Sequence, residues 1–156
     1  MVRSTTTLRL SSEDDTTQLG ETLAKYAQAG DCFLLRGQIG AGKSALARAF
    51  IRSLLGPDTE VPSPTFTLVQ SYEFENWEIW HADLYRLGDT QEAVELGLID
   101  AMIDQICLIE WPEILEDLAP ETAMDIELTV KPDCHLATLT YGENWSKRLA
   151  ETNEHA

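Results

Sequence analysis

The chain has 156 residues and carries 27 Asp and Glu against 11 Lys and Arg, so its formal net charge is −16 at neutral pH. This length fits a single domain over 1–156, and a content of 44% apolar and 24% charged residues excludes a disordered or fibrous chain. The acidity argues against direct binding of nucleic acid or an anionic membrane, because phosphate groups attract clustered Lys and Arg side chains.

Three further features indicate the compartment. No apolar stretch approaches the length of about 20 residues that spans a membrane. Residues 1–10 are polar and rich in Thr, without the apolar centre of a secretion signal. The three cysteines are scattered and form no C-x-x-C pair, which is typical of reduced thiols. We therefore expect a cytoplasmic protein.

The first third of the chain shows a strand, a helix, a strand and a helix in succession. Residues 4–10 alternate in polarity and predict a short strand, and apolar spacing within 12–30 predicts a helix that stops at Gly30. The run Cys32–Leu35 is fully apolar, as in a buried parallel strand. A glycine-rich segment follows, and then a predicted helix over Lys43–Leu55.

The rest of the chain contains a second fully apolar run, at 106–109. Two buried runs with helical segments between them predict an α/β fold, and the remaining strands make its sheet mixed, mainly parallel with antiparallel strands. The other predicted elements are a hairpin of 65–72 and 78–81, a helix over 91–96, an antiparallel pair of 124–130 and 135–141, and a closing helix over 143–152.

Residues 37–44 read G-Q-I-G-A-G-K-S and match the phosphate-binding pattern G-x-x-x-x-G-K-[ST]. A phosphate chain needs several converging backbone N–H groups, and a tight loop with few Cβ atoms supplies them at the positive end of a helix dipole. The alternative is a plain glycine turn, but a chance match in such a chain is below about 1%. The pattern therefore predicts a three-layer P-loop NTPase-like fold with nucleotide contacts at Gly37, Gly40, Ala41, Gly42, Lys43, Ser44 and Ala45.

Glu110 directly follows the second buried run. Because neighbouring parallel strands open their carboxyl ends onto the ligand crevice, this side chain should lie beside the loop. There it would hold Mg²⁺ directly or through water, together with the Ser44 hydroxyl. The alternative is a strand that ends in Glu without a functional reason.

Two segments between the loop and Glu110 carry further candidates. In H-A-D-L-Y-R at 81–86, Asp83 could orient an attacking water and Arg86 could stabilise a transferring phosphoryl group. The alternative is a surface Asp–Arg pair, and His81 alone is interpreted as a structural histidine. In P-S-P-T-F at 62–66, Thr65 could offer a hydroxyl to Mg²⁺ as part of a switch, the alternative being a rigid turn.

Together, these segments resemble the TsaE (formerly YjeE) family of small bacterial ATPases. The matching segments are T-T-Q-L-G at 16–20, the loop, S-P-T-F-T-L at 63–68, H-A-D-L-Y-R-L at 81–87, E-L-G at 95–97 and L-I-E-W-P-E at 108–113. The resemblance implies ATP and Mg²⁺ as ligands, slow ATP hydrolysis, and TsaB and TsaD as protein partners. In that family TsaD transfers threonylcarbamoyl to adenosine 37 of tRNAs that read codons beginning with A, and TsaE supports the cycling of the complex.

The resemblance also implies roles for individual residues. Lys43 and Ser44 would bind phosphate and Mg²⁺, and Glu110 would be the carboxylate on the metal side. Asp83 would serve hydrolysis or its coupling, Thr65 would be the switch hydroxyl, and Thr16 would lie near the base. The chain departs from the usual G-D-[LM]-G-A-G-K-T at three positions, which are Gln38, Ile39 and Ser44.

Two other functions remain open from the sequence. A small-molecule kinase closes several Arg side chains over its phosphates, whereas beyond the P-loop helix this chain offers only Arg86, Lys131, Lys147 and Arg148. A nucleotide-controlled binding switch without useful hydrolysis would need the same Thr65, Asp83 and Glu110. ATP is expected rather than GTP because the chain has no N-K-x-D guanine signature.

Overall fold

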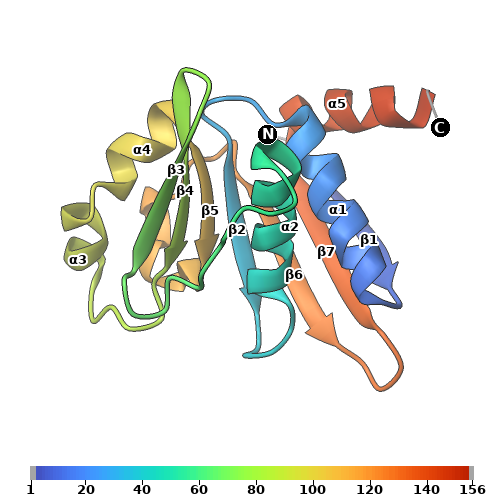
Figure 1. Cartoon of the computed structure of the whole chain (residues 1–156), viewed down its shortest axis with the longest axis horizontal. Coiled ribbons are helices and arrows are strands. Elements are labelled where there is room, and N and C mark those ends of the chain that lie inside the picture. Colours follow the sequence, from blue (N-terminus) through green and yellow to red (C-terminus); the bar gives the residue numbers. More distant parts are fainter. Residues whose placement is uncertain (1–2, 155–156) are drawn as a thin grey trace.

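A seven-stranded sheet forms the middle layer of the protein (Figure 1). The computed structural model describes residues 3–154, and the side chains of all of these except residues 116 and 151–154. Within this part the strand order is β1-β7-β6-β2-β5-β4-β3. The strands are β1 (Ser4–Leu10), β2 (Cys32–Gly37), β3 (Val69–Phe74), β4 (Trp77–Asp83), β5 (Ile106–Glu110), β6 (Met124–Val130) and β7 (His135–Tyr141).

Parallel pairing is confined to the centre of the sheet. β2 pairs in parallel with β6 and β5, and β5 pairs in parallel with β4. The outer pairs β1–β7, β6–β7 and β3–β4 are antiparallel. This arrangement confirms the predicted α/β fold with a mixed sheet, and it turns the carboxyl ends of β2, β5 and β4 toward the same edge.

Helices cover both faces of the sheet and complete three layers (Figure 1). One face carries α1 (Glu13–Tyr26), α2 (Lys43–Leu55) and α5 (Glu143–Glu154). The other face carries α3 (Thr90–Glu95), α4 (Leu98–Asp104) and the 3₁₀ helix η1 (Pro112–Leu118). The three-layer architecture expected from the P-loop motif is therefore present.

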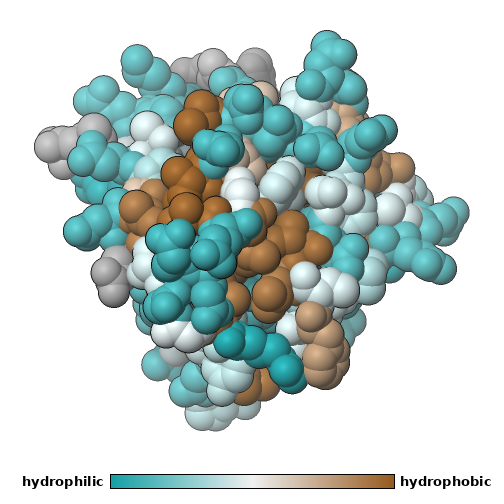
Figure 2. All heavy atoms as spheres, turned by 90° about the vertical axis from the view of Figure 1, so that its left-hand side faces the viewer, coloured by the Kyte–Doolittle hydropathy of each residue, from teal (hydrophilic) through white to brown (hydrophobic). Residues whose placement is uncertain are grey.

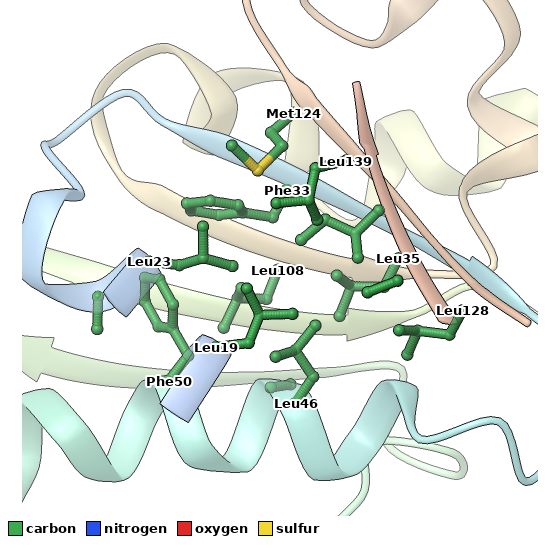
Figure 3. Packing of buried hydrophobic residues seen from close by; sticks show 14 of the residues in the cluster. Leu19, Leu23, Phe33, Leu35, Leu46, Phe50, Leu108, Met124, Leu128 and Leu139 are labelled. Carbon is green, nitrogen blue, oxygen red and sulfur yellow. The ribbon is translucent and has the colours of Figure 1, made fainter. Parts of the chain in front are cut away.

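The larger part of the core lies between the sheet and α1, α2 and α5 (Figure 3). Phe33 of β2 is fully buried there and makes edge contacts with Phe50, at 5.2 Å, and with Trp145, at 5.5 Å between ring centroids. Alternate residues of β2 face the opposite layer, where Cys32 lies beside Cys107 of β5. Burial raises the pKa of Cys32 well above its usual value and that of Cys107 to about 12, so both thiols stay protonated.

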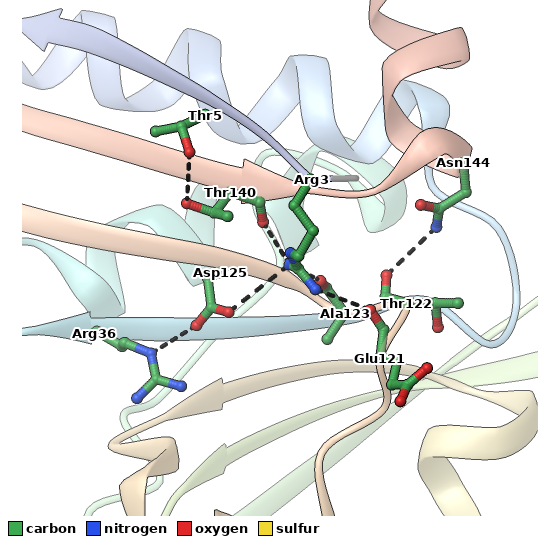
Figure 4. Close-up of polar contacts among 9 residues, drawn as sticks. All are labelled: Arg3, Thr5, Arg36, Glu121, Thr122, Ala123, Asp125, Thr140 and Asn144. Atoms are coloured by element: carbon green, nitrogen blue, oxygen red, sulfur yellow. Dashed lines mark hydrogen bonds and ion pairs between the residues drawn. The ribbon is translucent and has the colours of Figure 1, made fainter. Parts of the chain in front are cut away.

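Hydrogen bonds and ion pairs connect the strands at the β1-β7-β6 end of the sheet (Figure 4). Arg3 donates to the backbone carbonyls of Ala123 at 2.8 Å and Thr140 at 3.0 Å. Asp125 on β6 accepts a 2.6 Å bond from Nε of Arg36 on β2 and lies 3.9 Å from Arg3. The Asp125–Arg36 bond links β6 to β2, the strand that leads into the glycine-rich loop, and Arg3 adds a contact with β7.

Several sequence predictions need correction. β3 begins at Val69 rather than residue 65, because the Leu68 N–H bonds to the Pro64 carbonyl at 2.7 Å and closes a turn over 64–68. The first helix ends at Tyr26 rather than near Gly30. Neither α4 nor η1 was predicted, because each is short and lies next to the apolar run of β5, whose pattern is stronger.

The face that carries α3 and α4 shows apolar side chains at the surface, bordered by hydrophilic ones (Figure 2). Val94 on α3 and Ile103 on α4 are exposed, and so is Leu118 at the end of η1. Among the described residues, no helix is both long enough and apolar enough to cross a membrane.

We expect Gly20→Ala to lower the free energy of unfolding by about 1–2 kcal/mol, because overpacking costs more than the helix propensity gained. A Cβ at Gly20 would lie 2.7 Å from Cβ of Ala49 and 3.0 Å from the Phe50 amide nitrogen, where α1 meets α2. Urea unfolding followed by circular dichroism measures the change. Gly88→Ala is the matched control, since its Cβ would approach only the Glu92 carboxylate, at 3.4 Å. Equal midpoints for both variants and wild type would contradict the close approach of the two helices.

Candidate functional site

The loop 37–42 joins the end of β2 to the start of α2 and depends on its glycines. Gly37, Gly40 and Gly42 have φ angles of 143°, 85° and 108°, in the region that side-chain-bearing residues avoid. At Gly37 a Cβ would also lie 2.5 Å from the Leu128 carbonyl oxygen of β6. Gly42 is the N-cap of α2, so the loop backbone meets the positive end of that helix. The loop therefore follows a path that requires glycine at these three positions and leads into the N-terminus of α2.

Lys43 is buried under this loop. Its ammonium donates to the carbonyls of Gly37 at 2.5 Å and Gln38 at 2.9 Å, and it lies 4.1 Å from the ring centroid of Trp111. Burial lowers the pKa of Lys43, while the Glu110 and Asp83 carboxylates act in the opposite direction. A bound anion would compensate this desolvation, so the ammonium is suited to meet phosphate.

Gln38, which replaces the Asp usual in the family, takes part in the loop through its backbone. The Gln38 side chain is exposed, and its backbone carbonyl serves the loop by accepting from Lys43 and from the Ala41 amide. Ile39 is also exposed, with 77% of its surface accessible. The side chains at 38 and 39 therefore face solvent, and the loop's bonds at position 38 use the backbone carbonyl.

Two carboxylates lie side by side at the carboxyl ends of β4 and β5. Asp83 and Glu110 are direct cross-strand partners, with 6% and 3% of their surfaces exposed. Glu110 accepts from the Ser44 hydroxyl, at 3.0 Å to Oε1 and 3.1 Å to Oε2. The strand alignment thus brings Glu110 to the start of α2, as the sequence predicted.

Thr65 joins Asp83 from the turn that precedes β3. Its hydroxyl lies 3.4 Å from Asp83 Oδ2, a long hydrogen bond, and 2.8 Å from the Ser63 hydroxyl. Asp83 Oδ1 accepts from the Tyr85 amide at 3.0 Å, which leaves Oδ2 toward Thr65. The alternative interpretation, a surface pair of Asp83 and Arg86, is not found, and the Arg86 guanidinium lies over the Phe66 ring at 4.5 Å.

These groups line one cleft of about 490 Å³. It contains Lys43 and Ser44 from α2, Thr65 from the turn, Asp83 and Arg86 from the end of β4, and Glu110 and Trp111 from the end of β5. The cleft therefore combines cations, carboxylates and hydroxyls within one small volume.

A larger cleft, of about 1130 Å³, opens on the other side of the loop. The two clefts share Gly40, Gly42 and Ala45. Thr16, in the first turn of α1, lines the larger cleft. A molecule bound across the loop would therefore extend from the carboxylates on one side to Thr16 on the other.

The oxygen donors of the smaller cleft fit Mg²⁺. Ser44, Glu110, Asp83 and Thr65 offer hydroxyl and carboxylate oxygens, which this hard cation prefers. Among the described residues, no three His, Cys, Asp or Glu side chains gather into a metal site. Mg²⁺ commonly takes one or two protein carboxylates and completes its shell with phosphate and water.

Some residues of the site had no sequence signal. His135 at the start of β7 lies with Nδ1 3.0 Å from the Ala41 carbonyl and so contacts the loop from the larger cleft, which Arg48 and Lys131 also line. No motif contains these residues, since the fold brings them together from distant segments. The Tyr85 ring contacts that of Trp111 in a tilted arrangement with 4.9 Å between centroids, and only its place in the 81–86 segment would have suggested it.

Known proteins of one family match this chain. The family model described as threonylcarbamoyl adenosine biosynthesis protein TsaE matches residues 10–136. The tRNA threonylcarbamoyladenosine biosynthesis protein TsaE of Rickettsia felis is 39% identical over 123 residues, which cover 79% of this chain and 72% of that protein. The TsaE protein of Bacillus subtilis is 33% identical over 119 residues, covering 76% and 73%.

A solved structure has the same fold. A crystal structure of YdiB from Bacillus subtilis superposes with a TM-score of 0.78 and covers 99% of this chain and 98% of its own, at 23% identity. The family model and the relatives bear out the resemblance drawn from the motifs. This chain belongs to the TsaE family of threonylcarbamoyl adenosine biosynthesis proteins.

Proposed function

We propose that this chain is the Mg-ATP-binding and -hydrolysing subunit required for threonylcarbamoyl modification of adenosine 37 in tRNAs that read codons starting with A, and that it acts with a TsaB–TsaD complex. One observation carries the proposal. Lys43, Ser44, Asp83 and Glu110 come from three elements and converge on one cleft beside the glycine-rich loop at the start of α2.

The loop and α2 would hold the triphosphate. Backbone amides and the helix dipole attract the phosphates, and Lys43 exchanges its bonds to the loop carbonyls for bonds to phosphate oxygens. Mg²⁺, held by Ser44 and Glu110, would neutralise charge on the phosphates. The adenosine would extend into the larger cleft toward Thr16.

Asp83 would serve the hydrolytic step. Its Oδ2 faces Thr65 and the cleft, so it can orient a water toward the terminal phosphorus and take the proton that the water loses. The water oxygen then bonds to phosphorus as the bridging P–O bond breaks, giving ADP and inorganic phosphate. Thr65 lies on a turn closed by one backbone bond, which suits a segment that responds to the phosphate.

The surface supports protein partners rather than direct tRNA contact. A net charge of −16 repels a phosphate backbone. Around the smaller cleft, the apolar side chains of Ile39, Phe66 and Tyr85 are exposed, with 77%, 81% and 59% of their surfaces accessible. Exposed apolar side chains grouped in this way are typical of protein interaction sites.

The kinase alternative receives little support from the cleft. Lys43 and Arg86 are the cationic residues among those that line it, and the Arg86 guanidinium lies over Phe66. A lid with several arginines over the phosphates is not formed by the described residues. Nucleotide-dependent switching without useful hydrolysis would use the same groups, and the variants below separate it from hydrolysis.

We expect Lys43→Ala to weaken ATP binding by about 100-fold or more, because the variant loses a charged donor that would make more than one hydrogen bond to phosphate. Isothermal titration calorimetry with Mg-ATP measures the dissociation constant. Lys147→Ala removes the same charge from an exposed position on α5 and should bind like wild type. Nanomolar ATP binding by Lys43→Ala would contradict the proposed site.

Asp83→Asn should keep ATP binding within about threefold but lower hydrolysis by about 10²- to 10⁴-fold, the range that general base catalysis contributes. Asn retains the acceptor for the Tyr85 amide and removes the charge that would take the proton. The assay is reconstituted tRNA modification with TsaB, TsaD, tRNA and threonylcarbamoyl-adenylate, measuring ATP consumed per modified tRNA.

The matched control for that assay is Asp89→Asn, an exposed N-cap that Asn can replace. If Asp83→Asn modifies tRNA at the wild-type rate with equal nucleotide occupancy, Asp83 has no coupling role. If it modifies tRNA normally while hydrolysis is lost, the chain acts as a nucleotide switch instead.

A further inference from the structure

His81 is buried directly behind the carboxylate of Glu110. It lies on β4 with only 1% of its surface exposed, and its Nε2 is 2.6 Å from Glu110 Oε2. His81 pairs across β4–β5 with Leu108, two residues before Glu110. Because side chains alternate along a strand, Glu110 and His81 project from the same face of the sheet.

The chemistry of this contact assigns its donor. A carboxylate oxygen accepts hydrogen bonds, so the proton in the 2.6 Å contact belongs to Nε2 of His81. The other ring nitrogen, Nδ1, is buried and has no hydrogen-bond partner among the described residues. Glu110 is therefore the hydrogen-bond partner of the imidazole in the part of the chain that the structure describes, and burying an unpartnered Nδ1 costs free energy that an apolar side chain would avoid.

The bond from His81 completes the constraint on Glu110. Its Oε2 accepts from both His81 and the Ser44 hydroxyl, and Oε1 also faces Ser44. Donors on two sides, one from β4 and one from α2, fix the rotation of the carboxylate about its last side-chain bond. His81 itself lines neither of the clefts beside the loop.

We infer that His81 is a positioning residue whose Nε2–H holds the Glu110 carboxylate in the orientation in which it and Ser44 meet the Mg²⁺ of bound Mg-ATP. This inference rests on the proposed function. It assigns His81 no contact with nucleotide and no part in the chemical step.

Two uncharged variants of His81 test this role. Gln carries its amide N–H at the distance of the imidazole Nε2, whereas Asn carries it at the position of Nδ1 and cannot reach Glu110. The readout is the dissociation constant of a non-hydrolysable ATP analogue, measured by calorimetry in excess Mg²⁺ and in EDTA. The ratio of the two constants reports the metal-dependent part of binding without any turnover.

We expect His81→Asn to lose about 10- to 100-fold of the Mg²⁺-dependent strengthening, as is typical when a partner of a metal ligand is removed. Its affinity in EDTA should stay within about threefold of wild type, and His81→Gln should retain the wild-type ratio within about threefold. Wild-type ratios in both variants would overturn the inference. Equal losses with and without Mg²⁺ in both variants would also overturn it, because they indicate a purely structural role.

A measurement on the unaltered protein does not depend on how the variants fold. ¹⁵N-detected NMR of the imidazoles reports which ring nitrogen of His81 carries a proton, and the inference requires a proton on Nε2. A bare Nε2 would overturn it. If Nε2 proves bare, the proposed function still stands as long as wild type binds Mg-ATP and Lys43→Ala does not. Absence of nucleotide binding by wild type would instead refute the proposed function itself.

Discussion

The parallel alignment of β2, β5 and β4 is the constraint on which the site depends. Leu35 pairs with Glu110, and Glu110 pairs with Asp83, so the last residues of β5 and β4 lie level with Leu35, two residues before the end of β2. The glycine-rich loop leaves from the first of these strands, and the two carboxylates end the others. Because side chains alternate along a strand, a slip of one residue would turn Glu110 to the opposite layer and separate it from Ser44.

Within this frame, the local electrostatics differ from those of the chain as a whole. The protein carries a charge of −16, yet a buried ammonium, a helix N-terminus and a glycine-rich backbone meet at one point. Lys43 is partly compensated by loop carbonyls and by the face of Trp111. An anion that reaches the loop therefore finds an attractive environment inside an acidic surface that repels polyanions.

The sequence predicted the parts of the site that are carried by contiguous patterns. The loop, the buried strand before Glu110 and the polar end of β4 follow from local spacing, and the parallel pairing follows from two fully apolar runs. The features that the sequence did not predict depend on contacts that no local pattern encodes. The turn over 64–68 forms through one backbone bond where alternation suggested a strand, and the contact of His81 with Glu110, which lies 29 residues further along the chain, has no local signal.

The placement of Lys43 on the indole of Trp111 has an optical consequence. A cation 4.1 Å from the ring centroid perturbs the excited state of the indole, so its emission depends on where the ammonium lies. Phosphate drawing the ammonium off the ring would alter that emission without any added dye. Trp145, by contrast, is fully buried in the core beside Phe33 and would contribute a steady background. If phosphate binding moves the lysine as proposed, Trp111 would serve as an intrinsic fluorescent reporter of that step.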